Sequence, residues 1–60
     1  MDAEVIKSIV KDHLVRKGCS VELADDLLAG YAEMIYEDFD NGESCEEIAQ
    51  SIIDNEEFRS

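Results

Sequence analysis

The segment from Ser20 to Phe39, SVELADDLLAGYAEMIYEDF, carries the longest uninterrupted helical pattern in the chain and constrains its fold most. At 100° per residue, its apolar side chains fall within about half of the helix circumference. They are Leu23, Ala24, Leu27, Leu28, Tyr31, Met34, Ile35 and Phe39. Because a surface helix usually hides a stripe only about 100° wide, this arc predicts a long central helix over residues 20–39, packed on both flanks, with Leu27 and Ile35 in the core.

A first helix is predicted over residues 3–17, with Asp2 as its N-cap and Gly18 in the left-handed position that commonly follows a helix. Its apolar stripe consists of Val5, Ile6, Ile9, Val10 and Leu14. His13 lies on the same arc, and no nucleophile has a spacing that implicates it in catalysis, so we expect a boundary position. The connection to Ser20, the next N-cap, is short, so the first two helices should be antiparallel neighbours.

A third helix is predicted over residues 44–53, opened by an S-x-x-E capping box of Ser44 and Glu47. Asn41 and Gly42 precede it and tolerate positive φ. Its apolar face consists of Cys45, Ile48, Ala49, Ile52 and Ile53.

Phe58 would lie off that face, so we expect the third helix to break at Asp54 or Asn55 and Phe58 to anchor a short C-terminal turn. With 60 residues, no Pro and three Gly, the chain is predicted to form one acidic helical domain over residues 1–60. The predicted fold class is all-α, a small three-helix bundle.

Several kinds of chemistry lack the residues that they need. In the run DFDNGE, Gly42 comes one position too early for a calcium loop, and Ala49 stands where the closing Glu belongs. Two Cys and one His have no zinc-ligand spacing. Since no phosphate loop or nucleophile constellation is present either, we predict no catalytic residue, no metal, no cofactor and no enzymatic activity.

The net charge is −11, and it is unevenly distributed. Residues 1–18 hold four cations and three acids, whereas residues 19–60 hold 13 acids and one cation, Arg59. Such a chain repels nucleic acid and anionic lipid, so no direct nucleic-acid binding and no membrane contact are expected. Without a signal peptide pattern or an apolar run near about 20 residues, we predict a cytoplasmic protein with reduced Cys19 and Cys45.

Eight carboxylates are predicted to form a partner-binding surface, called here the acidic face. They are Glu22, Asp26, Glu33, Glu37, Asp40, Glu43, Glu46 and Glu47. The first four align along the predicted central helix with rises of about 6, 10.5 and 6 Å at 1.5 Å per residue, which resemble steps between phosphates of a nucleic-acid strand. No Lys or Arg accompanies them on residues 20–39.

Two hypotheses of function follow. In the first, the chain is an inhibitor or adaptor of phage or mobile-element type, whose acidic face mimics nucleic acid and docks on a basic protein surface. In the alternative, it is a structural or regulatory dimerisation module that uses an apolar surface near Val15, Ala29 and Tyr36, and its acidity only maintains solubility. Only the first predicts binding that weakens steeply with salt.

Because a short chain gains stability from added buried area, a homodimer is expected over a monomer.

Overall fold

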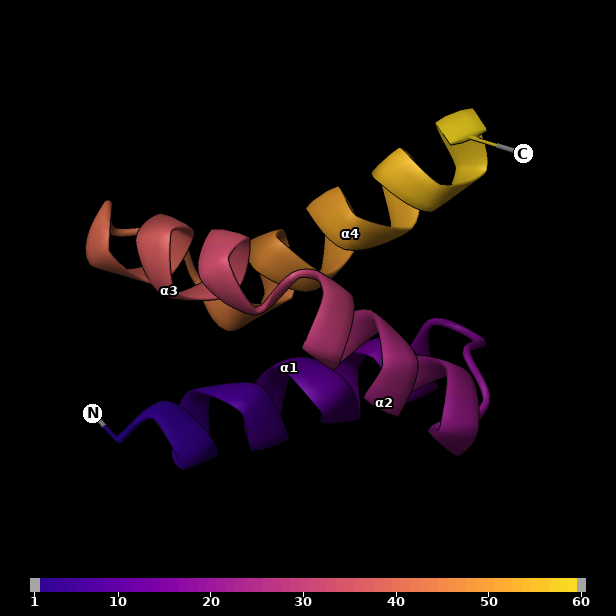
Figure 1. The fold of residues 1–60 in the computed structure, drawn as a ribbon, viewed down its shortest axis with the longest axis horizontal. Coiled ribbons are helices and arrows are strands. Elements are labelled where there is room, and N and C mark those ends of the chain that lie inside the picture. Colours follow the sequence, from indigo (N-terminus) through magenta and orange to yellow (C-terminus); the bar gives the residue numbers. More distant parts are fainter. Residues whose placement is uncertain (1, 60) are drawn as a thin grey trace.

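The computed structural model describes residues 2–59, with side chains up to residue 57, and all regular elements in this part are helices. They are α1 (Ala3–Arg16), α2 (Val21–Gly30), α3 (Ala32–Asp40) and α4 (Cys45–Arg59). The predicted all-α class is confirmed. Figure 1 shows α1 along one side of the molecule, α2 and α3 forming a bent pair, and α4 returning toward the end where α1 finishes. The most extensive helix contacts join α1 to α2 and α4, and α3 to α2 and α4.

The single central helix predicted over residues 20–39 is wrong, because the structure divides it at Tyr31 into α2 and α3. Tyr31 has φ −108° and ψ 17°, outside the regular helical range, and α3 begins without a side-chain cap. Gly30, just before it, is about 1 kcal/mol less favourable than Ala inside a helix, so the chain bends there at low cost. The bend also explains the wide apolar arc, since α2 packs on α1 while α3 packs on α4. Within residues 2–59, four helices therefore replace the predicted three.

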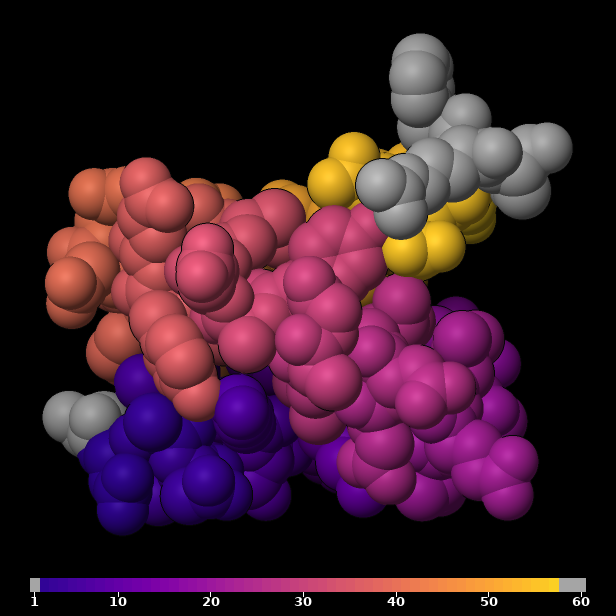
Figure 2. All heavy atoms as spheres, viewed as in Figure 1, coloured from indigo at the N-terminus to yellow at the C-terminus, as the bar shows by residue number. Residues whose placement is uncertain are grey.

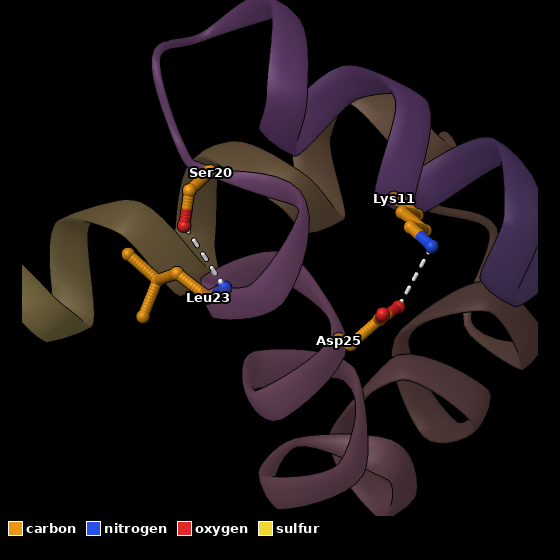
Figure 3. A network of polar contacts seen from close by, with 4 residues as sticks. All are labelled: Lys11, Ser20, Leu23 and Asp25. Atoms are coloured by element: carbon orange, nitrogen blue, oxygen red, sulfur yellow. Dashed lines mark hydrogen bonds and ion pairs between the residues drawn. The ribbon is translucent and has the colours of Figure 1, made fainter.

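The predicted N-caps of the first two helices are confirmed. The backbone N–H of Glu4 donates to Asp2 Oδ1 at 3.4 Å, and the backbone N–H of Leu23 donates to Ser20 Oγ at 3.1 Å (Figure 3). Gly18, with φ 108°, occupies the left-handed conformation that ends α1. Because a side chain at that φ is strained, glycine fits this short connection.

The capping box at the start of α4 is also confirmed. Ser44 Oγ accepts the backbone N–H of Glu47 at 3.2 Å, while the backbone N–H of Ser44 donates to Glu47 Oε1 at 3.4 Å. Gly42 has φ 95°, whereas Asn41 has φ −80°. Of the two residues expected to permit a positive φ, only the glycine uses it.

The break predicted at Asp54 or Asn55 is wrong, because α4 continues to Arg59. No Gly or Pro follows Gly42, so nothing in the backbone chemistry stops the helix. Gln50 Nε2 donates to Asp54 Oδ1 at 3.0 Å, one turn apart, which supports the helix across the expected break. The anchoring role predicted for Phe58 lies outside the described side chains.

The core draws on all four helices. Its buried residues are Ile6, Val10, Leu14, Ala24, Leu27, Leu28, Ile35, Ile48, Ala49 and Ile52. Predicted burial was wrong for Leu23 and Val5, which are 48% and 45% exposed. Both lie at the edge of their helix's apolar arc, beyond the side that the neighbouring helices cover. The sequence did not predict the packing of α1 on α4, because local helical periodicity does not specify which distant helices meet.

Candidate protein-binding surface

The structure divides the predicted acidic face into two groups. Glu22 and Asp26 lie on α2, before the bend. The other six lie on α3, on the turn that follows, and on the first turn of α4, and we call them the α3–α4 acidic surface. Its members are Glu33, Glu37, Asp40, Glu43, Glu46 and Glu47. All eight side chains are exposed except that of Glu43, which is half-buried.

The ion pairs among the described side chains form away from this surface. Lys11 Nζ lies 2.8 Å from Asp25 Oδ1 and joins α1 to α2 (Figure 3). Arg16 pairs with Asp12 at 3.0 Å, within α1. These are the ion pairs found among the described side chains, and neither includes a residue of the acidic face.

The remaining cations with described side chains make contacts other than ion pairs. Lys7 Nζ lies over the ring of Tyr36, 5.6 Å from its centroid. Lys17 Nζ donates to Gln50 Oε1 at 2.9 Å and so joins the end of α1 to α4. None of the carboxylates of the α3–α4 acidic surface forms an ion pair with a described cation, although Lys7 approaches α3 at Tyr36. Their field extends into solvent.

The turn between α3 and α4 concentrates this charge. Partial burial raises the pKa of the Glu43 carboxyl above its usual value of 4.5, and the neighbouring Asp38 carboxylate, a side-chain hydrogen bond with Asp38, and Glu47 raise it further. The backbone N–H of Glu43 donates to the carbonyl oxygen of Asp38 at 3.1 Å, which fixes the turn. Three carboxyl groups thus share one short segment, at a cost in repulsion.

Asp38 was not included in the predicted acidic face, although the structure places it among these carboxyls. It is half-buried. The Asn-Gly pair three residues later was the available signal, because a tight turn there brings residues 38 and 43 together.

The raised pKa of Glu43 sets an expected pH dependence of stability. Below pH 4.5 Glu43 is protonated in both the folded and the unfolded chain, and the stability that comes from the higher proton affinity of the folded state is fully present. This stability is lost as pH rises through the folded-state pKa. Glu43→Gln should therefore melt at a higher temperature than the wild type at neutral pH, with the gap narrowing as pH falls toward 4.5. Thermal unfolding followed by circular dichroism measures this.

Asp26→Asn is the matched control, because it removes one charge from an exposed site in the middle of α2. It should raise the melting temperature less than Glu43→Gln at neutral pH. Equal effects of the two variants would show that overall charge, rather than the turn, determines the pH dependence.

Within the described part of the chain, no cluster of three or more His, Cys, Asp or Glu side chains is arranged to hold a metal ion. None of the described helices is both long and apolar enough to cross a bilayer.

Of the residues assigned to an apolar contact in the alternative hypothesis, Val15 and Ala29 are exposed on α1 and α2, whereas Tyr36 is half-buried on α3. These three residues lie on three different helices.

Comparisons of the chain with protein-family models, with curated proteins and with solved structures find no match.

Proposed function

We propose that this chain is a small protein-binding module that docks its α3–α4 acidic surface on a Lys/Arg-rich surface of a partner protein. In this proposal it acts as an inhibitor or adaptor, of the kind that phages and mobile elements direct against host proteins, and the partner's basic surface is one that otherwise holds nucleic acid. The observation that supports the proposal is the gathering of six carboxylates on adjoining elements, none of which forms an ion pair with a described cation.

The electrostatic repulsion within this arrangement favours a functional role for the carboxylates. Like charges one helical turn apart, such as Glu33 and Glu37, destabilise a helix by a few tenths of a kcal/mol. Interleaved Lys residues would remove that cost. A basic partner also removes it, because its cations neutralise the carboxylates on binding.

The carboxylates that are proposed to mimic nucleic acid do not form a straight row along one helix. The step from Asp26 to Glu33 crosses the bend at Tyr31, so a constant rise per residue does not apply to it. The bend leaves two shorter sets of charge. The set on α3 and α4 is the larger and includes the crowded Glu43, so the partner's densest group of cations is expected to meet this set.

Affinity capture from lysate at two salt concentrations tests the proposal. At about 0.05 M salt the Debye length exceeds 10 Å, and at about 0.5 M it is under 5 Å. A basic protein should be retained at low salt and released at high salt. Capture with a Glu33→Lys, Glu37→Lys bait serves as the control and should lose that protein. If the retained proteins resist high salt and bind both baits equally, contact is made through an apolar surface and the proposal fails.

A further inference from the structure

The outer side of α1 is a surface that its packing on α2 and α4 leaves open. The buried residues of α1 lie on one side of the helix: Ile6, Val10 and Leu14. At 100° per residue, the opposite side is centred on four exposed residues. They are Val5, Ser8, Asp12 and Val15, and we call them the α1 stripe. Val5 is 45% exposed and Val15 is 38% exposed, so the stripe has apolar side chains at its ends and polar side chains in its middle.

The spacing of the α1 stripe is the same in both directions along the helix. Val5 and Val15 lie equally far from Val10 in the sequence, and so do Ser8 and Asp12. If a second α1 runs antiparallel with its Val10 at the same level, Val5 lies level with Val15 of the second copy. Ser8 then lies level with Asp12 of the second copy. A twofold axis makes each of these pairs occur twice.

The two polar residues of the stripe complement each other. Within the described part of the chain, the Ser8 hydroxyl makes no hydrogen bond. Asp12 Oδ2 contacts Arg16 at 3.0 Å, so the other carboxylate oxygen of Asp12 can accept a hydroxyl proton. A hydrogen bond from a hydroxyl to a carboxylate is among the stronger ones in proteins. Space for an approaching side chain is present beside Ser8, in an open hollow of about 460 Å³ lined by Ser8, Ile9, Lys11, Asp12 and Val15.

The charges in and beside the α1 stripe are balanced. They belong to two acids and two cations, Glu4, Lys11, Asp12 and Arg16. Asp12 pairs with Arg16, and Lys11 pairs with Asp25 at 2.8 Å. Residues 19–60, in contrast, hold 13 acids and one cation. Two copies of this chain therefore meet the least repulsion where their α1 helices face each other.

We propose that the α1 stripe is the contact between two copies of the chain, related by a twofold axis at the level of Val10. Val5 of each copy packs against Val15 of the other, and the Ser8 hydroxyl of each copy donates to the Asp12 carboxylate of the other. A basic partner gains no attraction from a balanced surface and is drawn to the α3–α4 acidic surface instead. An unrelated apolar partner has no reason to repeat the spacing of the stripe, whereas an antiparallel α1 repeats it by symmetry.

The dimer should be weak. From Val5 to Val15 the stripe extends about 15 Å at 1.5 Å per residue, so the contact is smaller than the roughly 800 Å² per partner of a standard interface. We expect a dissociation constant on the order of 0.1 mM. Two chains of charge −11 also repel one another beyond the contact, over about 8 Å at physiological salt, so association should strengthen as salt is added.

The contact is separate from the proposed partner surface. In Figure 2 the indigo surface of α1 lies at the lower left of the molecule, whereas the orange surface of the turn between α3 and α4 lies above it. At about 10 μM the chain should be monomeric, so partner binding can be measured without self-association. The dimer does not rest on the proposed function, because a chain with no basic partner would still associate.

Sedimentation of the full chain in reducing buffer, at about 0.15 M and about 0.5 M salt and up to about 1 mM protein, tests the contact. The wild type should show a monomer–dimer equilibrium that shifts toward dimer at higher salt. Val15→Gln should weaken association at least about tenfold, because it removes an apolar contact from both ends of the interface. Val21→Gln is the matched control, since Val21 is also exposed, at 54%, but lies at the start of α2.

The antiparallel pairing has its own test by introduced charges. Val5→Glu or Val15→Lys alone should weaken the dimer at least about tenfold. The double variant should associate at least about fivefold more tightly than either single variant, because the new carboxylate of each copy then faces the new ammonium of the other. A parallel contact would place like charges together and weaken the double variant further.

Circular dichroism melting verifies that each variant is folded. A wild type that stays monomeric at about 1 mM at both salt concentrations would overturn the proposal. So would a dimer that Val15→Gln leaves intact, equal weakening by Val21→Gln, or a double variant that associates no more tightly than the single variants.

Discussion

Ile35→Ala is expected to lower the free energy of unfolding by roughly 2 to 5 kcal/mol. Ile35 is fully buried and is the buried residue that α3 contributes to the core. Its loss therefore leaves a cavity where α3 meets the other helices. For a domain of this size, total stability is only about 3 to 9 kcal/mol, so the variant should be largely unfolded at 37 °C or melt far below the wild type. Urea and thermal unfolding followed by circular dichroism measure the change.

Leu27→Ala should behave in the same way, because Leu27 is 7% exposed and anchors α2. Leu23→Ala is the control. It removes the same number of atoms from the same helix at a position that is 48% exposed, so it should cost less than about 1 kcal/mol. If Ile35→Ala and Leu27→Ala unfold like the wild type, or if Leu23→Ala costs as much as they do, the packing described here is wrong.

Reversing two charges on α3 should have the largest effect on partner binding. Glu33→Lys with Glu37→Lys should weaken binding by more than about tenfold, because each desolvated, hydrogen-bonded charge pair at the centre of an interface costs about 2 to 5 kcal/mol when one partner is removed. Most of the loss should appear at low salt, where attraction over long distances is greatest. Titration calorimetry with the captured basic protein, at two salt concentrations, measures it.

Two further double variants change the net charge by the same amount. Glu22→Lys with Asp26→Lys acts on α2, beyond the bend, and should weaken binding less than the α3 pair. Glu4→Lys with Asp12→Lys acts on exposed positions of α1 and should change partner binding only through bulk charge. Thermal melting checks that this variant is folded, because Asp12 pairs with Arg16. Equal losses from all three would show that net charge alone matters. No loss from any would identify the acidic face as a solvated surface.

Local sequence signals predicted the capped helix starts and the end of α1 correctly. Ser20, Ser44 and Gly18 act through their own backbone and its immediate neighbours, so their roles depend little on the rest of the fold. The apolar face of the third helix was also predicted correctly, because Ile48, Ala49 and Ile52 recur at helical spacing and are all fully buried.

The bend at Tyr31 and the length of α4 could not be predicted in this way. A helical pattern continues through Gly30, and the cost of one glycine is too small to mark a break. The contacts that accompany the bend are tertiary: α3 packs on α4, and the Tyr31 hydroxyl donates a hydrogen bond to Glu56, 25 residues away. The same contact reaches the part of α4 that the sequence pattern assigned to a turn. Long-range contacts of this kind do not appear in local periodicity.

The sequence predicted that uncompensated carboxylates form an acidic surface, but it did not predict how they are arranged in space. Charge counts identified the uncompensated carboxylates, since the absence of Lys and Arg from residues 20–39 is visible in the sequence. Their division into two groups follows from the bend. The inclusion of Asp38 beside Glu43 follows from the turn at Gly42.

Backbone amide chemical shifts, recorded while the captured partner is titrated into the isotopically labelled chain, test the central claim most directly. If the α3–α4 acidic surface is the docking site, the largest changes will fall on residues 33–47, with smaller changes on α2. They should shrink when salt is raised to about 0.5 M. Largest changes on residues 17–27 and 53–57, at the opposite end of the molecule (Figure 1), that stay the same when salt is raised would contradict the account.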